Sequence, residues 1–335
     1  MCSFNLKYLP GIHILMKFSI VITTYNRLPF LKRAVESALN QTVPCEVIVA
    51  DDCSDDGTAD YIKSLNNKVI YYHNVENLGH SKTVNAGVSV ATGDWIKLLD
   101  DDDYLAPNCI EKMAEAITSY PKAVICSCQG IQVNKKGKEL NRTHIRGKCE
   151  NFLIPQDDIH YAMLMEMLPF GTPVQVAFQR NAFFQSGGWD STLDGNCDDI
   201  DSWVRISQYG DAVILNKYLA YRTIWSASCN QKFPLVKRLE TNFLIKKRIY
   251  NLVSLKYQSL LPDLAIIEQY LRLHWSLASF KKGCLITAIR IASPAIFSLA
   301  AWSLLLQIIY RRNFSNQEVY LDHQYSTLQL LAIID

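Results

Sequence analysis

Short β-rich runs alternate with helical segments over the first hundred residues, and this alternation most restricts the folds open to the chain. Apolar and β-branched residues gather at 18–23, 46–50, 69–72 and 95–99, and helical patterns fill the stretches between them. Strands separated by helices pair in parallel, because a crossover helix returns the chain to the same end of the sheet. We therefore predict an α/β protein with a mainly parallel central sheet and helices on both faces.

Polar loops follow three of these strands. Residues 23–27 end the first strand, residues 51–56 end the second, and residues 100–103 follow the fourth. Ligands of open α/β sheets bind outside the carboxyl ends of the strands, so these loops are expected to meet there. The sequence thus predicts one oxygen-rich site at this edge of the sheet.

Four consecutive aspartates, Asp100 to Asp103, are the strongest chemical signal. Carboxylates this close repel one another unless a cation, hydrogen bonds or solvent offset the repulsion. Magnesium and manganese take oxygen ligands and commonly bridge to substrate phosphates. The tetrad therefore predicts a metal-assisted phosphate site. Taken alone it would equally suit a solvated acidic turn that caps the helix after Pro107, but the convergence of three polar loops favours the phosphate site.

Charge, cysteine usage and missing motifs exclude other classes. The net charge is +2 over 335 residues, without a basic stripe, so no nucleic-acid partner is expected. The chain lacks the glycine-rich fingerprints of Rossmann and P-loop proteins. The ten cysteines include no CxxC pair. We interpret Cys126 and Cys128, on one face of a strand, as reduced packing residues of a cytosolic protein, with a zinc site as the alternative.

The amino-terminal stretch carries no convincing secretory signal. A second methionine, Met16, stands immediately before the first strand. We expect Met16 to be the functional start and residues 1–15 to be an extension without a structural role.

The order and spacing of the motifs resemble family-2 glycosyltransferases with the GT-A fold. The matching segments are SIVITTYNR at 19–27, LNQT at 39–42, VADDCSDDGT at 49–58, NLG at 77–79, NAG at 85–87, ATGD at 91–94, LDDDD at 99–103, GGWD at 187–190, and DDID at 198–201 with Arg205. Each segment is weak alone, but together, over about residues 16–225, they are specific.

The resemblance implies a nucleotide-sugar site. It matches Thr23 and Asp52 to positions that hold the nucleotide base, usually uracil. The side chains expected in the same pocket are Tyr25, Asn26 and Arg27. Relatives often carry an arginine where this chain has Val84, so Lys82 either supplies phosphate charge or is a surface lysine.

The resemblance also implies catalytic roles for aspartates. Asp102 would coordinate a divalent metal, Mn²⁺ or Mg²⁺, while Asp100 and Asp101 would bind ribose, phosphate or metal-bound water. Asp199 matches the general base, although helix capping alone would also explain Asp198 and Asp199. The chemistry agrees, because a leaving diphosphate needs neutralising and an acceptor hydroxyl must lose a proton as it attacks.

The acceptor side is expected in the second half of the domain. Relatives often have a histidine after the pair that corresponds to Tyr221-Arg222, whereas this chain continues to Trp225. The candidates for the acceptor side are Trp189, Asp190, Asp198 and Trp225.

We expect a metal-dependent inverting transferase that moves one sugar from a nucleotide diphosphate sugar, with UDP as the expected nucleotide, to a hydroxyl of a glycan or lipid-linked glycan. A nucleotidyltransferase is the enzymatic alternative, but it would need a glycine-rich basic loop near the first strand. An inactive glycan-binding or scaffold protein would have lost Asp102 or Asp199, and both are present.

The predicted organisation has a GT-A domain at 16–230, with a nucleotide-sugar half at about 16–130 and an acceptor half at about 131–230. A helical region follows at 231–335. Residues 291–310 carry no charge and lie between Arg290 and Arg311. They predict a membrane-associated helix, either spanning or lying in the interface, with a buried helix as the alternative. The expected location is the cytoplasmic face of the inner membrane.

Overall fold

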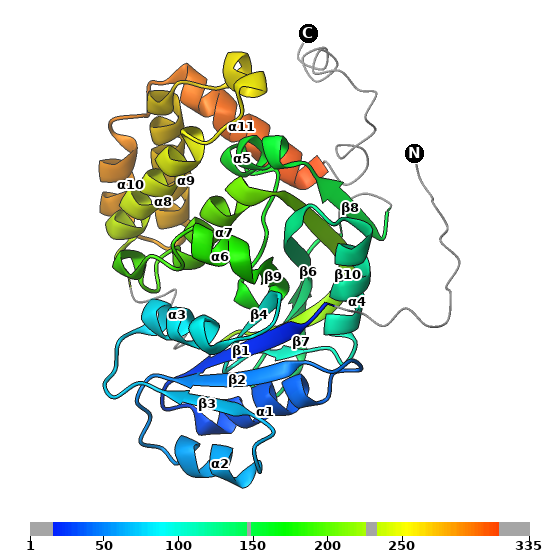
Figure 1. Ribbon diagram of the computed structural model, residues 1–335. Helices are drawn as coiled ribbons and strands as arrows, with labels where there is room; N and C mark the ends of the chain where they lie inside the picture. Colours follow the sequence, from blue (N-terminus) through cyan, green and yellow to red (C-terminus); the bar gives the residue numbers. More distant parts are fainter. Residues whose placement is uncertain (1–15, 146–148, 226–232, 315–335) are drawn as a thin grey trace.

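The computed structural model describes residues 16–145, 149–225 and 233–314 (Figure 1). The chain forms a ten-stranded sheet with helices against both faces, followed by a group of carboxyl-terminal helices. This confirms the predicted α/β class with a helical carboxyl-terminal region. The expected extension at 1–15 and the end of the chain at 315–335 lie outside the described residues.

The four predicted strands form a parallel block in the order β3-β2-β1-β4. The block comprises β1 (Phe18–Thr24), α1 (Leu28–Leu39), β2 (Glu46–Asp51), α2 (Thr58–Ser64), β3 (Ile70–His73), α3 (His80–Val90) and β4 (Trp95–Asp100). The register sets Thr24 opposite Asp51 and Thr23 opposite Asp100. The polar loops therefore leave the sheet side by side, as predicted.

The other half of the sheet is mixed. It comprises β5 (Tyr104–Leu105), α4 (Cys109–Ser119), β6 (Ala123–Val133), β7 (Glu139–Arg142), β8 (Asn151–Ile154), α5 (Gln156–Leu164), β9 (Val176–Gln179), α6 (Arg180–Gln185), α7 (Asp198–Ile206) and β10 (Asp211–Thr223). β9 enters antiparallel between β4 and β6, and β10 runs parallel to β6. The sheet as a whole is therefore mixed: the first four strands and the β6–β10 pair are parallel, while β5, β7, β8 and β9 pair antiparallel with their neighbours. The long strand β10 carries Thr223 to the aspartate tetrad.

Alternation along the strands divides the interior into two cores. Ile20 and Ile22 of β1 belong to the core under α1, α2 and α4, whereas Val21 belongs to the core on the opposite face, under α3. Cys126 and Cys128 of β6 are buried free thiols in the first of these cores. They share a strand face, as the sequence predicted.

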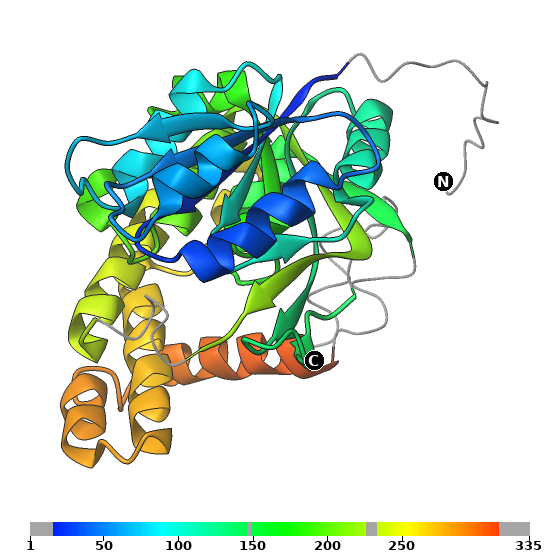
Figure 2. The same ribbon diagram turned by 90° about the horizontal axis from the view of Figure 1, so that it is seen from below.

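The carboxyl-terminal helices pack on the α3 side of the sheet. They are α8 (Leu235–Tyr250), α9 (Leu264–Lys281), α10 (Leu285–Ala292) and α11 (Leu299–Phe314). Their buried residues Ile249, Tyr270 and Leu305 join the same core as Phe178 of β9. Seen from below, these helices extend away from the sheet on one side (Figure 2).

The expected single helix at 291–310 is wrong. α10 ends at Ala292, the chain turns through residues 293–298, and α11 begins at Leu299. Pro294 lacks a backbone N–H and restricts the residue before it, which explains the break. α11 buries Leu304, Leu305 and Ile308 in the protein core. Among the described residues, no helix combines the length and the apolar character that crossing a bilayer requires.

Candidate functional site

A cavity of about 490 Å³ opens at the carboxyl ends of β1, β2 and β4. Residues of the parallel block form one wall, and residues around the start of α7 form the opposite wall. The aspartates that line it are Asp52, Asp100, Asp101, Asp102, Asp103, Asp194, Asp198 and Asp199. The cavity therefore gathers carboxylates from segments a hundred residues apart in the sequence.

The loop after β1 supplies the first side chains. Thr23, Tyr25 and Arg27 line the cavity. Asn26 is exposed instead, in a left-handed conformation with φ 51°. Its backbone N–H donates to Ser54 Oγ at 2.9 Å, and its Oδ1 accepts from the Asp55 N–H at 2.9 Å. Asn26 thus joins the first polar loop to the second rather than lining the cavity.

Asp52 lines the cavity and organises the turn before α3. Its Oδ1 accepts from the Leu78 N–H at 2.8 Å, and its Oδ2 accepts from the Gly79 N–H at 2.9 Å. Gly79 has φ 89°, and a Cβ there would lie 2.7 Å from Asp194 Oδ2. A glycine is therefore required at this point, which gives the NLG segment a physical reason.

The tetrad separates into a buried pair and a half-buried pair. Strand β4 ends at Asp100, and the next residues form a turn in which the Asp103 N–H donates to the Asp100 carbonyl at 3.0 Å. Asp101 and Asp103 are only 2% and 3% exposed. Asp101 accepts from Thr24 Oγ1 at 2.9 Å and from Arg27 Nη1 at 3.0 Å, and Asp103 accepts from the Thr223 N–H at 2.7 Å. Burial outweighs the nearby Arg27 charge and raises the pKa of Asp101 to about 7. Burial, with the charges of its neighbouring carboxylates, raises the pKa of Asp103 well above its usual value.

Asp100 and Asp102 are the half-buried pair. Asp102 Oδ2 accepts from Trp225 Nε1 at 2.7 Å and lies 3.7 Å from Arg27 Nη1. Burial and the charge of Asp100 raise the pKa of Asp102. Burial alone would raise the pKa of Asp100 as well, but the hydrogen bond and charge of His80 hold it below its usual value. These two carboxylates have the exposure that a ligand needs.

The opposite wall begins at Cys197, whose left-handed conformation (φ 67°) starts α7. Asp198 is buried and accepts from Ser81 Oγ at 2.9 Å and from the Gly195 N–H at 3.0 Å. Asp199 is half-buried, and burial together with the charge of Asp198 raises its pKa to about 7. A carboxylate with a pKa near neutrality can accept a proton at working pH, which suits a general base.

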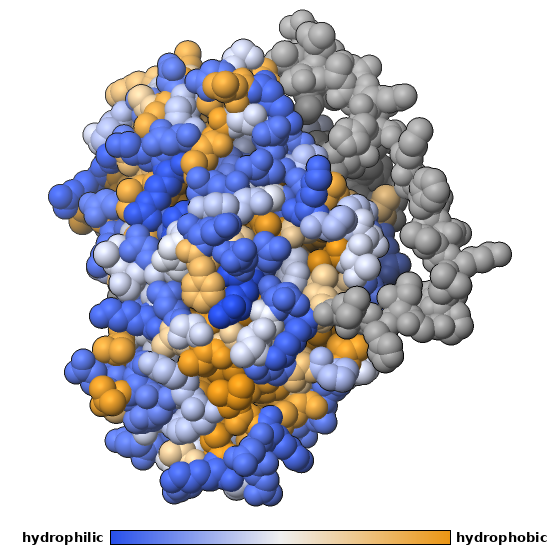
Figure 3. Space-filling model, in the orientation of Figure 1, coloured by the Kyte–Doolittle hydropathy of each residue, from blue (hydrophilic) through white to orange (hydrophobic). Residues whose placement is uncertain are grey.

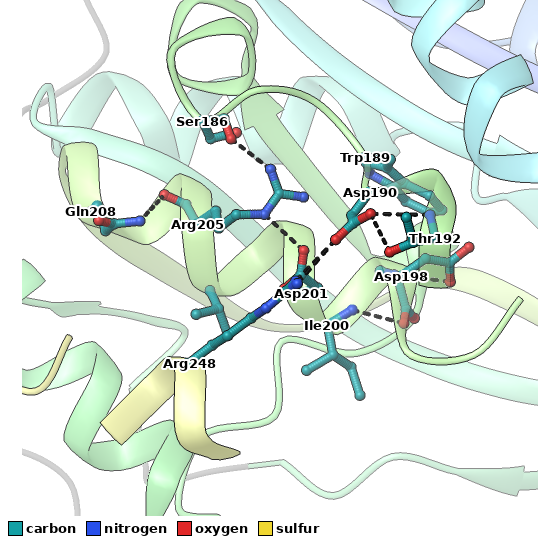
Figure 4. Close-up of polar contacts among 12 residues, drawn as sticks. Ser186, Trp189, Asp190, Thr192, Asp198, Ile200, Asp201, Arg205, Gln208 and Arg248 are labelled. Carbon is teal, nitrogen blue, oxygen red and sulfur yellow. Dashed lines mark hydrogen bonds and ion pairs between the residues drawn. The ribbon is translucent and has the colours of Figure 1, made fainter. Parts of the chain in front are cut away.

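Asp201, one turn along α7, is completely buried between two arginines (Figure 4). Arg205 Nε donates to its Oδ2 at 2.7 Å, and Arg248 Nη1, which reaches in from α8, donates to its Oδ1. Arg248 also lies 3.1 Å from Asp190 Oδ2, while Asp190 Oδ1 accepts from the Thr192 N–H at 3.0 Å. The carboxyl-terminal region therefore fixes the helix that carries Asp199.

His80 is a site residue that the sequence reasoning missed. Its Nε2 lies 3.1 Å from Asp100 Oδ1, and its Nδ1 lies 3.7 Å from Asp198 Oδ2, so it links the two walls. Burial alone would lower the pKa of His80, but its hydrogen bonds to Asp100 and Asp198 raise it well above the usual value. The available signal was its position directly after Gly79, at the first residue of α3.

Asp194 was also missed. Its Oδ1 accepts from the Ser81 N–H at 2.7 Å, and its donor atoms, with those of His80 and Asp198, lie within 4.8 Å of one another. This group could hold a metal ion. A metal bound there would have to displace the proton that the carboxylates of Asp100 and Asp198 favour on His80, since they raise its pKa. The oxygens of Asp100 and Asp102 better fit the donor set that Mg²⁺ and Mn²⁺ prefer.

The structure places the acceptor-side candidates in different surroundings. Trp189 lines the cavity, in edge contact with His80 at 5.3 Å between ring centroids. Trp225 holds Asp102 and lies under the Arg27 guanidinium, 5.4 Å from the ring centroid. Asp190 does not line the cavity and pairs with Arg248 instead.

Lys82 is exposed on α3 and does not line the cavity, while the neighbouring Ser81 and Thr83 are buried. The structure therefore gives Lys82 no contact with the other predicted site residues.

Comparisons with known proteins agree on family and fold. The family described as Glycosyl transferase family 2 matches residues 19–185. Hyaluronan synthase of Pasteurella multocida is 43% identical over 247 residues, which is 71% of this chain and 24% of that protein. The chain spans less than two fifths of the length of such curated relatives.

Two solved structures share the fold. TarS 1-349 of S. aureus in complex with UDP-GlcNAc has a TM-score of 0.61 and 17% identity, covering 92% of this chain and 94% of that chain. The mannosyltransferase PcManGT from Pyrobaculum calidifontis, in complex with GDP-Man and Mn²⁺, has a TM-score of 0.51 and 18% identity, covering 87% and 79%.

Proposed function

Since this chain belongs to glycosyltransferase family 2, we propose that it transfers a single sugar from a nucleotide diphosphate sugar to a hydroxyl of a glycan or lipid-linked glycan. The observation that carries the proposal is the meeting of two aspartate clusters in one cavity, the tetrad at the end of β4 and the group at the start of α7. One cluster suits a diphosphate with its cation, and the other suits a proton acceptor.

The donor would bind on the parallel-sheet wall. Thr23, Tyr25 and Asp52 offer hydrogen-bonding groups for a base and ribose, and Arg27 adds positive charge. Nucleotide sugars occupy the two related structures, UDP-GlcNAc in TarS and GDP-Man in the mannosyltransferase. We favour UDP and expect its diphosphate to lie near Asp100 and Asp102.

Asp102 would be the main protein ligand of a divalent cation, Mn²⁺ or Mg²⁺, with Asp100 beside it. When bound, that cation would neutralise the charge that develops on the leaving diphosphate. The related mannosyltransferase was solved with Mn²⁺, which supports this choice of metal. Asp101 and Asp103 would serve the site indirectly, because they hold Arg27 and the Thr223 backbone in place.

Asp199 would act as the general base. The acceptor hydroxyl oxygen attacks the anomeric carbon while its proton passes to the Asp199 carboxylate. The bond between that carbon and the diphosphate oxygen breaks, and the electron pair leaves with the diphosphate. Attack from the face opposite the leaving group inverts the anomeric centre, and no covalent enzyme intermediate is needed.

The acceptor would enter on the α7 side of the cavity, which Trp189 and Asp199 line. A lipid-linked glycan would bring the enzyme to the cytoplasmic face of the inner membrane.

The test is an incubation of the purified chain with a panel of UDP-sugars, Mn²⁺ and lipid-linked or free oligosaccharides, with product mass measured by mass spectrometry. A mass increase of one sugar that Asp199→Asn removes supports the proposal. Transfer that persists at the wild-type rate in Asp199→Asn would contradict the base assignment. The absence of transfer with every UDP-, GDP-, dTDP- and CMP-sugar would contradict the proposed activity.

A further inference from the structure

Bulky apolar side chains protrude into solvent around α10. Ile286 is 86% exposed, Phe297 is 93% exposed and Leu299 is 85% exposed. Three further residues of this kind are Leu285, Ile289 and Ile296. We call these six residues the α10 patch. Apolar side chains reach the surface over the carboxyl-terminal helices in the space-filling view as well (Figure 3).

The α10 helix has a buried face as well as this exposed one. α10 already buries Ala288, Ile291 and Ala292, and it packs on α9. A surface helix packed this way normally has a polar outer face, but the outer face of α10 is also apolar. In both ribbon views α10 lies at an edge of the molecule (Figure 1, Figure 2), where its outer face can meet a large flat partner.

The charges beside the patch have one sign. Lys281, Lys282 and Arg290 are exposed next to it. Residues 269–314 contain no aspartate or glutamate, although they contain six lysines and arginines. A second copy docked on this face would bring like charges together, which is unfavourable. A surface that offers both an apolar interior and negative charge would satisfy the patch and its lysines together.

We propose that the α10 patch attaches the protein to an anionic lipid surface. The six apolar side chains enter the interfacial region, and the three basic residues contact the headgroups. The inference deepens the membrane side of the proposed function. It concerns attachment and not sugar transfer, so binding is measured without donor or acceptor.

The experiment is sedimentation of the full chain with vesicles of phosphatidylcholine, alone or mixed with an equal part of phosphatidylglycerol. We expect binding to the anionic vesicles that weakens as salt rises from about 0.1 M to about 0.5 M. Ile286→Asn and Phe297→Ser should each weaken binding about tenfold or more, because each removes an apolar side chain from the interface. Lys281→Gln combined with Lys282→Gln should also weaken it, by about tenfold.

Val75→Ser is the matched control, because Val75 is 92% exposed in the loop between β3 and α3. It should bind vesicles like the wild type. Because the substituted side chains are exposed, each variant should keep the thermal midpoint of the wild type, and this is checked first.

Several results would overturn the proposal. One is a full chain that remains in the supernatant with anionic vesicles, which would indicate that something else covers the patch. Another is equal binding by Ile286→Asn, Phe297→Ser and the wild type. A concentration-dependent dimer in light scattering that Ile286→Asn disperses, without vesicle binding, would assign the patch to self-association. Loss of vesicle binding with sugar transfer to a soluble acceptor retained would leave the proposed chemistry intact.

Discussion

The two walls of the cavity carry similar runs of aspartate, but a turn orients one run and a helix orients the other. The tetrad leaves β4 at Asp100 and enters a turn closed by the hydrogen bond from the Asp103 N–H to the Asp100 carbonyl, and this turn buries Asp101 and Asp103. The group on α7 begins a helix, so the buried residues are three apart, at Asp198 and Asp201. What remains for chemistry is Asp100 and Asp102 on one wall and Asp199 on the other.

The difference shows that neighbouring aspartates of one acidic motif can have different roles. In each run some carboxylates hold the fold through arginines and backbone N–H groups, and the others face the cavity. The backbone geometry, rather than the residue type, assigns the role. Substitutions of neighbouring aspartates should therefore have effects of different kinds and sizes.

The largest effect is expected at Asp199. Asp199→Asn keeps the shape but cannot accept the proton, so turnover should fall about 10²–10⁴-fold. Nucleotide binding should remain, because the donor wall is untouched. Single-turnover transfer and nucleotide titration on the same preparation measure the two quantities. Equal losses in both would place Asp199 in the donor site instead.

The pH dependence of kcat/KM should report the ionisation of the same residue. The pKa of Asp199 is raised to about 7, and the base must be deprotonated to work. We therefore expect kcat/KM to rise about tenfold per pH unit below pH 7 and to level off above it. A profile that stays flat from pH 5.5 to 8 would separate catalysis from this carboxylate.

A smaller effect, on stability, is expected when an ion pair of the buried Asp201 on α7 is removed. Arg248→Met leaves the buried Asp201 carboxylate with Arg205 as its remaining guanidinium partner, so the free energy of unfolding should fall by about 1–3 kcal/mol. Arg272→Met is the matched control, because Arg272 pairs with Glu268 on the surface of α9 and should cost less than about 1 kcal/mol. Urea unfolding measures both. Similar losses would show that the α7–α8 contact is no stronger than a surface pair.

The smallest effect is expected at Asp103→Asn. Burial and the charges of Asp102 and Asp100 raise the pKa of Asp103 well above its usual value, so folding favours the neutral carboxyl, which an amide closely resembles in shape. Because the folded pKa exceeds the unfolded one, the wild type has this contribution below the unfolded pKa and loses it as pH rises through the folded pKa. Asp103→Asn has no carboxyl at this position, so its stability does not fall with pH for this reason. Its stability relative to the wild type, measured without metal, should improve from pH 4 to pH 8, and a decline would contradict the raised pKa of Asp103.

The parallel block and its polar loops were predictable because they depend on local patterns. Residues 18–23 and 95–99 carry strand signals, and the sheet rule brings their ends together. The tetrad drew attention as a group, but the separate roles of Asp101 and Asp102 required the observed burial.

The features of the site that the sequence did not reveal depend on contacts between distant segments. His80 gains its role from Asp100 and Asp198, which lie 20 and 118 residues further along the chain. Arg248 reaches Asp201 from a helix outside the matched family region. Composition alone gave no sign of either contact. Part of the apolar run at 291–310 is likewise explained by distant contacts, because Leu305 is buried in the core that it shares with Phe178.

The central claim is that the tetrad wall binds the donor and the α7 wall supplies the base. It is tested most directly by titration calorimetry of UDP, with and without Mn²⁺, into the wild type, Asp102→Ala and Asp199→Asn. We predict metal-dependent binding that survives in Asp199→Asn and is lost in Asp102→Ala. Binding that survives in Asp102→Ala, or that disappears in Asp199→Asn, would contradict the assignment of the tetrad to the donor and of α7 to the base.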